Sequence, residues 1–275
     1  MKNKHFWLGI VAAAALASAG CGDDDNGGAA GAGGNGGMGG TPMPTGNVTA
    51  VHLAPEVPSA EDTSVALFVN GAEATDLGTL EYSQSTGKIA LPVGTYDIGI
   101  GVPGGDAPLL SLDGVELGEG DDLVVVAYRT NEELPVDVFV FVNSTEGLEA
   151  GNGLVFVGHG ANDPALDPVD ISLGEDPECS TLIPGFVFGT TAPEDGLPLP
   201  EGSYQIGFDL TPEDENDCAD FGPVPVPVTP DVVSILIAVD ENTSNDAEQL
   251  NPELWAIIPD AEAPDNQPIR TIQTQ

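Results

Sequence analysis

Three cysteines are the residues of this chain whose side chains most directly suggest covalent chemistry. A thiol can be acylated, can join a second thiol in a disulfide, or can bind a metal. Cys179 and Cys218 lack the close CxxC spacing of metal and redox pairs, and they lack an accompanying histidine. Because the N-terminus described below indicates export, we expect Cys179 and Cys218 to form a disulfide between two loops. A metal or redox pair is the alternative.

Two histidines recur at equivalent places and are candidate metal ligands. His52 lies in "VTAVHLAPEVP" and His159 in "LVFVGHGANDP", an offset of 107 residues. Each histidine ends an apolar run beside a turn, where its ring can bond a backbone carbonyl. Two such residues in separate modules cannot share one ion unless the modules face each other. We therefore expect a structural role for both histidines and no metal site.

Two acidic stretches raise the question of calcium. "TPEDENDCAD" (211–220) and "LGEDPE" (173–178) carry clustered carboxylates, and the expected disulfide would draw them together. Calcium takes six to eight oxygen ligands, but the spacing of an EF-hand loop is absent. We expect solvated loops and no cofactor, with calcium as the open alternative.

Catalytic motifs are missing from the sequence. It contains no GxSxG or HExxH pattern and no phosphate-binding loop, and "GVPGGD" (101–106) is a turn between strands. "DTS" (62–64) lacks the glycine and the second copy that an aspartic protease needs. Aromatic residues make up 5% of the chain, and neither Trp7 nor Trp255 belongs to a cluster in the sequence. We expect a protein that is not an enzyme and has no catalytic residues.

The charge of the chain is extreme. It has 45 acidic and 5 basic residues. Once an N-terminal signal is removed, Lys88, Arg129 and Arg270 remain as the only basic residues, for a net charge of −42. Such a polyanion is repelled by phosphate backbones and by anionic lipid headgroups, which excludes nucleic acid as a partner.

The N-terminus has the pattern of a secretory signal peptide. Residues 1–20 comprise a short basic region, an apolar stretch and small residues, and the stretch is too short to span a membrane as a helix. The end, "ASAGC", is similar to the lipobox of bacterial lipoproteins, with Ser18 in the place of the usual leucine. In that class the cysteine, here Cys21, carries three acyl chains, more than stable anchoring requires. The alternative is a signal peptide cleaved elsewhere.

A glycine-rich segment follows the signal. Residues 21–47 contain Cys21 and the stretch "GDDDNGGAAGAGGNGGMGGTPMPTGN". Such a composition cannot bury enough apolar surface to offset the entropy of ordering. We therefore expect a flexible tether between a lipid anchor in a bacterial membrane and the folded part, which faces the periplasm or the cell exterior.

The rest of the chain consists of two similar sequence repeats. "LPVGTYDIGI" (91–100) returns as "LPEGSYQIGF" (199–208), an offset of 108 residues. "DDLVVVAY" (121–128) meets "PDVVSILIAV" (230–239) at nearly the same offset. A constant offset over separate blocks indicates a tandem duplication of about 100 residues per copy, the usual size of a domain. We place the first module at 48–148 and the second, with a short tail, at 149–275.

The hydrophobic period within each copy is two, as in strands. Val65, Leu67 and Val69 lie two positions apart and so share one face of a strand, as do Tyr96 and Ile98. "LVVVAY" and "VFVFV" are apolar throughout, which indicates strands covered on both faces or at a contact between modules. Turn residues recur every 8–15 positions. We expect an all-β chain of two tandem antiparallel, immunoglobulin-like β-sandwich modules.

The opening "VTAVHLAPEVPSAEDTSVALFVNG", the later "LPVGTYDIGI" and "DLVVVAY" together resemble the bacterial domain of unknown function 4397. The resemblance covers residues 48–143 and 153–258. Members of that family are mostly secreted or anchored, and the family implies no chemistry. In the second copy "GAND" replaces "LAPE". The motif positions are His52, Pro55, Val65, Gly94 and Tyr96 in the first copy and His159, Gly202 and Tyr204 in the second.

These observations together predict an exported, lipid-anchored protein with a non-catalytic binding or structural role at the cell envelope. Its partners would be the membrane, through the lipid, and an envelope or extracellular protein or polysaccharide. Two alternatives stay open: a calcium-dependent adhesion module and an extracellular enzyme that acts on polysaccharides.

Overall fold

Strands form nearly all of the regular structure of this chain. The computed structural model describes residues 43–59, 62–130, 136–162, 166–174, 179–209, 221–240, 253–259 and 269–271. No α-helix occurs in these ranges, and one 3₁₀ turn, η1, spans Thr75–Leu77. The all-β prediction is confirmed.

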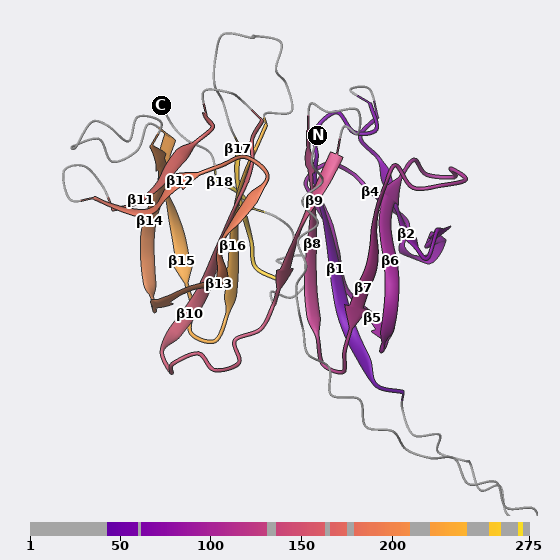
Figure 1. Ribbon diagram of the computed structural model, residues 1–275, viewed down its shortest axis with the longest axis horizontal. Coiled ribbons are helices and arrows are strands. Elements are labelled where there is room, and N and C mark those ends of the chain that lie inside the picture. The colour runs from indigo at the N-terminus through magenta and orange to yellow at the C-terminus, as the bar shows by residue number, and fades with distance from the viewer. Residues whose placement is uncertain are drawn as a thin grey trace, which may run out of the picture. The chain divides into compact units, whose positions relative to one another are not determined.

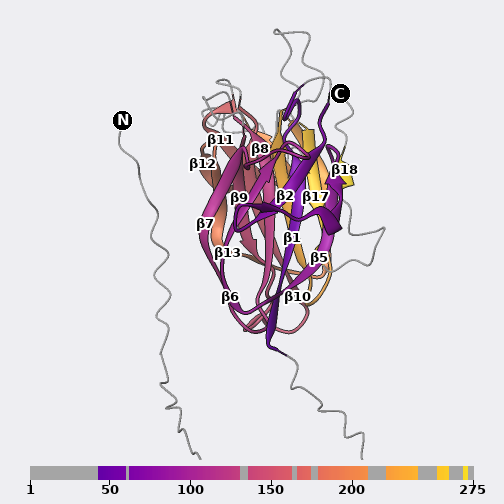
Figure 2. The ribbon, with the colours of Figure 1, turned by 90° about the vertical axis from the view of Figure 1, so that its right-hand side faces the viewer.

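The first copy is a sandwich of two sheets, seen from their edges in Figure 1 and face on in Figure 2. One sheet has the order β5-β1-β8-β9, and the other has the order β3-β2-β6-β7 with β4 also paired to β2. Their facing side chains form one core. The strands are β1 (Thr45–Leu53), β2 (Val65–Val69), β3 (Ala72–Glu73), β4 (Thr79–Leu80), β5 (Gln84–Pro92), β6 (Gly94–Gly101), β7 (Leu110–Leu117), β8 (Asp122–Arg129) and β9 (Val136–Val142).

The second copy repeats this plan. Its sheets have the orders β13-β10-β16-β17-β18 and β12-β11-β14-β15, and they enclose a second core. The strands are β10 (Asn152–Gly160), β11 (Val169–Leu173), β12 (Ser180–Phe186), β13 (Thr190–Pro200), β14 (Gly202–Asp209), β15 (Phe221–Val228), β16 (Val233–Val239), β17 (Glu253–Ile257) and β18 (Ile269–Thr271).

One strand pair in each copy is parallel, which the sequence pattern did not predict. β1 runs parallel to β8, with His52 opposite Ala127, and β10 runs parallel to β16, with His159 opposite Ala238. All other strand pairs of the described residues are antiparallel. The duplication therefore extends to the register of pairing, and these registers define which residues of the two copies are equivalent.

A third core joins the two copies. Residues 42–275 form one compact unit, and buried side chains of β1, β8 and β9 pack against those of β10, β16 and β17. Along β8, alternate residues from Val124 to Tyr128 lie in this shared core, while those from Leu123 to Ala127 lie in the core of the first copy. The prediction that "LVVVAY" is covered on both faces is thus confirmed.

The other wholly apolar run, "VFVFV", is covered differently. It lies in β9, which is the edge strand of its sheet. Phe139 and Phe141 lie in the shared core, while Val140 and Val142 on the opposite face are 40% and 52% exposed. β9 therefore lies at the contact between modules, and only one of its faces is fully buried.

Three pairs of aromatic rings among the described residues join the two copies: Tyr82 with Trp255, Tyr128 with Phe188, and Phe141 with Phe156. The ring of Tyr82, just before β5, lies edge-on to Trp255 of β17, with centroids 5.8 Å apart. The Tyr82 hydroxyl donates to Oε2 of Glu253 at 2.6 Å, and the indole Nε1 of Trp255 donates to the same atom at 3.1 Å. The expectation that Trp255 stands apart from other aromatic residues is therefore wrong, because its partner is 173 residues away in the sequence.

Glycines of β10 accommodate rings of the first copy. A Cβ on Gly160 would lie 2.9 Å from Cγ of Tyr128, and one on Gly158 would lie 3.3 Å from the Phe139 ring. The equivalent residues of β1 are Leu53 and Val51, which lie in the shared core. The change from "VHL" to "GHG" between the copies is thus explained by packing at their contact.

We expect Gly160→Ala to lower the free energy of unfolding by about 1–3 kcal/mol, because the added methyl group overlaps the Tyr128 ring. Tyr128→Val removes the ring, so the double variant should lose less than the sum of the two single variants. Urea unfolding followed by Trp255 fluorescence measures these values. Gly94→Ala is the control, because its Cβ would meet Tyr96 at an ordinary 3.5 Å. Simple additivity of the two changes would contradict the contact.

Candidate functional site

The two recurring histidines lie in the cores of the copies and bond the backbone. Nε2 of His52 donates to the carbonyl of Thr63 at 2.8 Å, and Nε2 of His159 donates to that of Leu166 at 2.6 Å. Both side chains are 1% exposed. Burial is the largest influence on each ring and lowers its pKa, against the opposing effect of the bonded carbonyl. The expected bond to a backbone carbonyl is confirmed in both copies.

The repeated segments 91–100 and 199–208, each of which contains a tyrosine, also have a structural role. The hydroxyl of Tyr96 donates to the carbonyl of Pro92 at 2.6 Å, and that of Tyr204 donates to the carbonyl of Pro200 at 2.9 Å. Each ring lies against the glycine two residues earlier, Gly94 or Gly202. A tyrosine that bonds the backbone a few residues upstream fixes the corner between two strands, as in other sandwich folds.

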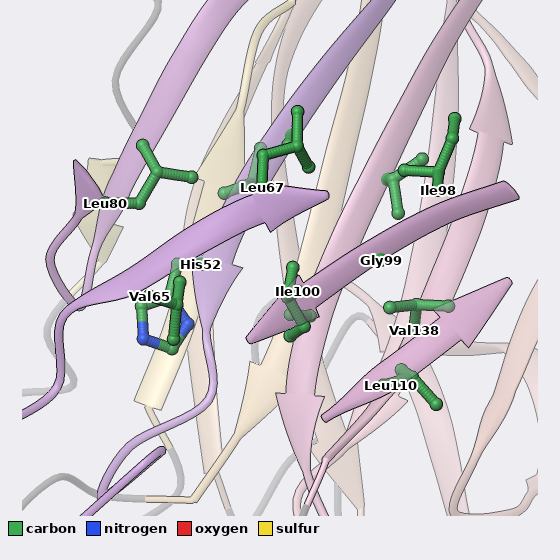
Figure 3. A pocket seen from close by; sticks show the side chains of 13 residues that line it. His52, Val65, Leu67, Leu80, Ile98, Gly99, Ile100, Leu110 and Val138 are labelled. Carbon is green, nitrogen blue, oxygen red and sulfur yellow. The ribbon is translucent and has the colours of Figure 1, made fainter. Parts of the chain in front are cut away.

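A small cavity lies inside the first sandwich. Figure 3 shows apolar side chains of both sheets around it, with His52 at one side. Its volume is about 20 Å³, which is no larger than a single water needs. Because its walls are mostly apolar side chains, a water inside it would find few hydrogen-bond partners. This space is a packing defect of the core rather than a place for a substrate.

The outer face of the sheet β12-β11-β14-β15 carries a buried polar group that we call the outer triad: Asp170, Ser172 and Asp209. Asp170 of β11 is directly opposite Asp209 of β14, and Ser172 is opposite Gly207. The neighbours Ile171 and Phe208 lie in the inner core, so the triad stands on the other face. Its members are 8%, 3% and 6% exposed.

Hydrogen bonds hold only part of the outer triad. Oδ1 of Asp170 accepts the backbone N–H of Gly185 at 2.6 Å, which fixes that carboxylate. The hydroxyl of Ser172 is buried and bonds no residue of the described chain. Asp209 takes part in a further interaction. A buried hydroxyl without a partner is costly, so this group requires an explanation.

The outer triad was not predicted, although a signal for it exists in the sequence. The registers pair "VALF" (65–68) with "VDIS" (169–172), and "GIG" (99–101) with "GFD" (207–209). Where the first copy has apolar residues or glycine, the second has oxygen-bearing side chains. Comparison of the copies position by position would have found this difference, whereas a search for motifs did not.

Several of the site residues expected from the sequence fall outside the described residues. Cys21, Cys218 and the acidic stretch 211–220 fall outside the described residues, as does most of 173–178. Cys179 is half-buried and directly precedes β12. The Cys179–Cys218 disulfide thus stays a prediction. Within the described ranges, no three His, Cys, Asp or Glu side chains group so as to hold a metal, and no helix is long and apolar enough to cross a membrane.

Two of the basic residues are already engaged. Lys88 pairs with Asp122 at 2.5 Å, and Arg129 pairs with Glu56 at 2.7 Å. The remaining surface charge is overwhelmingly negative, which raises the local concentration of cations.

Comparison of the sequence with family models and with curated proteins adds no relative. No family model matches this sequence, and no curated protein matches it. The resemblance to the domain of unknown function 4397 accordingly stays a prediction.

The buried histidines should make stability depend on pH. Because burial lowers the pKa of His52 and His159 below 6.5, their contribution is present above that pH and is lost as the pH falls toward the lowered value. The loss is at most about 1.4 kcal/mol per histidine for each pH unit. Urea unfolding at pH 7.5 and 5.5 should show a smaller fall for the double variant His52→Gln/His159→Gln. Equal falls in both proteins would mean that the rings are not kept neutral in the core.

The expected disulfide is tested by mass spectrometry without reductant, which should show Cys179 joined to Cys218. Closing this loop contributes up to about 4 kcal/mol by the chain-entropy estimate. Cys179→Ser and Cys218→Ser should therefore lower stability equally, and the double variant should be no worse than either. Free thiols in the exported chain would refute the pairing.

Proposed function

We propose that this protein is an exported bacterial lipoprotein with a non-catalytic binding or structural role at the cell envelope. The sequence "ASAGC" supports acylation at Cys21, and the glycine-rich residues 22–47 support a tether. The resemblance to a family of secreted or anchored domains agrees with this proposal.

The shared core is the observation that carries the proposed role. It joins two sandwiches into one body, so a tether at one end would carry both copies together. Residues that recur between the copies form hydrogen bonds with the backbone. His52 and His159 donate to carbonyls of the segments that follow their strands. Tyr96 and Tyr204 donate to carbonyls at the turns that precede theirs. The duplicated features thus support a scaffold that displays surfaces and loops rather than a duplicated reaction centre.

The partner would be an envelope or extracellular protein or polysaccharide. Carboxylates dominate the surface, which favours partners with basic groups or contacts bridged by cations. Protease treatment of intact cells, followed by capture of crosslinked partners, would determine the side of the membrane and the class of partner. A catalytic turnover of an envelope polysaccharide by the purified chain would contradict the non-catalytic role.

Cys21→Ser should move the protein from the membrane fraction to the soluble fraction, because it removes the only site for the lipid. Cell fractionation with immunoblotting measures the distribution. Gly22→Ser, directly after Cys21, is the matched control, since it leaves the thiol in place and should leave the protein on the membrane. Retention of Cys21→Ser in the membrane fraction would refute the lipid anchor.

A further inference from the structure

Strand β9 of the first copy and strand β17 of the second occupy equivalent places, but only β17 is followed by a further strand. Ala127 and Ala238 are equivalent because each lies opposite a recurring histidine. Val138 of β9 is opposite the first alanine, and Leu254 of β17 is opposite the second. In the second copy β18 pairs antiparallel with β17, whereas within the described ranges the first copy adds no strand to β9.

The free edge of β9 carries backbone groups that its own sheet does not use. The N–H of Asn143, directly after β9, donates to the carbonyl of Asp122 at 2.8 Å, so Asn143 points toward β8. Successive residues of an antiparallel strand point their backbone groups to opposite sides, so those of Val138, Val140 and Val142 point away from β8. The N–H of Val138 agrees with this, because it donates to a side-chain oxygen, Oδ1 of Asp137, at 2.8 Å.

The side chains of β9 do little to protect this edge. Natural edge strands are commonly protected by lysine, proline or a bulge. Val136–Val142 contains no lysine or proline, and its register with β8 has no shift. Val140 and Val142 are apolar and half exposed. A regular apolar edge with unused backbone groups is a template for another strand.

The strand that the second copy adds indicates the chemistry of an occupant. β18 (Ile269–Thr271) belongs to "NQPIRTIQTQ" (266–275), a segment without an acidic residue in a chain that has 45 of them. Arg270 is the only basic residue after Arg129, and its place in the register is opposite Trp255. The segment is therefore apolar, polar and basic where the rest of the chain is acidic.

The first copy has matching residues for such a strand. Phe139 is equivalent to Trp255, and Asp137 is equivalent to Glu253, so both edges have an aromatic residue two positions from a carboxylate. A strand on β9 in the register of β18 would place a basic residue opposite Phe139, on the side of the Asp137 carboxylate. Asp137 could then exchange the N–H of Val138 for that basic group, which frees the N–H to pair with the added strand.

We propose that β9 binds an extended segment of an envelope or extracellular protein by strand addition. The segment runs antiparallel to β9, alternates apolar with polar residues, and carries a basic residue and no acidic one. Backbone hydrogen bonds at Val138, Val140 and Val142 supply affinity, and the negative charge of the chain favours a basic partner. The same charge opposes pairing of β9 with a second copy, because two polyanions repel each other. This inference rests on the proposed binding role and names the partner class.

The probe is a labelled peptide of residues 266–275, because it contains the strand that the equivalent edge takes. Fluorescence anisotropy with the exported chain, at about 0.15 M potassium chloride, measures its affinity. Hydrogen exchange with mass spectrometry locates the site. We expect saturable binding and slower exchange in the fragment that covers 136–143. A peptide with Arg270→Glu should bind about tenfold more weakly, because an attractive cross-strand charge pair becomes repulsive.

Val140→Lys is the variant of the chain that should block this edge. Lysine protects edge strands and repels a basic segment, so the affinity for the peptide should fall about tenfold or more. Val102→Lys is the matched control, because Val102 follows β6 and is 43% exposed, against 40% for Val140. It adds the same charge and should bind the peptide as the parent chain does. Val142→Lys should repeat the loss, and thermal unfolding checks that each variant is folded.

The contrary results are equally specific. No saturable binding, or slower exchange only at 253–257, would overturn the proposal, as would equal affinities of Val140→Lys and Val102→Lys. Sedimentation equilibrium without peptide tests a second copy as the occupant: a dimer that Val140→Lys dissociates would replace the foreign segment by another copy of this chain. The lipid anchor is tested separately by Cys21→Ser, so failure of the anchor and failure of the edge are distinguishable.

Discussion

The burial of both faces of β8 and β16, each in the sheet of its copy that contributes to the shared core, is the constraint on which the rest of the structure depends. β8 and β16 contribute to two cores at once, so they cannot alternate apolar and polar residues as half-exposed strands do. Charged groups that remain at depth in these sheets are paired: Oε2 of Glu253 accepts hydrogen bonds from Tyr82 and Trp255, and Lys88 neutralises Asp122.

Equivalent strands of the two copies form the two sides of the shared core. Tyr82 of the first copy meets Trp255 of the second, and Phe188, which precedes β13 as Tyr82 precedes β5, meets Tyr128 at 5.8 Å. The strands that form the two sides, β1, β8 and β9 in the first copy and β10, β16 and β17 in the second, are equivalent, as in the isologous interface of a two-fold dimer. The duplication has placed such an interface within one chain, where each side can then change alone. Gly158 and Gly160 are such a change, since they make room for rings only on one side.

Much of this architecture could be predicted from the sequence because hydrophobic period and repeat offset report burial directly. The alternation of Val65 and Leu67, or of Ile206 and Phe208, gave the correct inner faces. The same pattern cannot say which strand is the neighbour, so the parallel pairing of β1 with β8 was missed. It also cannot find contacts between distant residues, such as Tyr82 with Trp255. The outer triad escaped because its members carry no motif and are brought together only by the register.

The constraint on β8 and β16 also indicates where the copies can acquire different properties. A change in β8 or β16 disturbs two cores, whereas a change on the outer face of β11 or β14 disturbs only the layer that covers it. The copies differ accordingly: the buried core positions of β2 and β11 stay apolar, while Phe68 on the outer face of the first copy corresponds to Ser172 in the second. Polar chemistry could be introduced there without loss of the shared core. The outer sheet of the second copy is therefore where the two copies differ most in polar chemistry among the positions compared, Ala66, Phe68 and Gly101 against Asp170, Ser172 and Asp209.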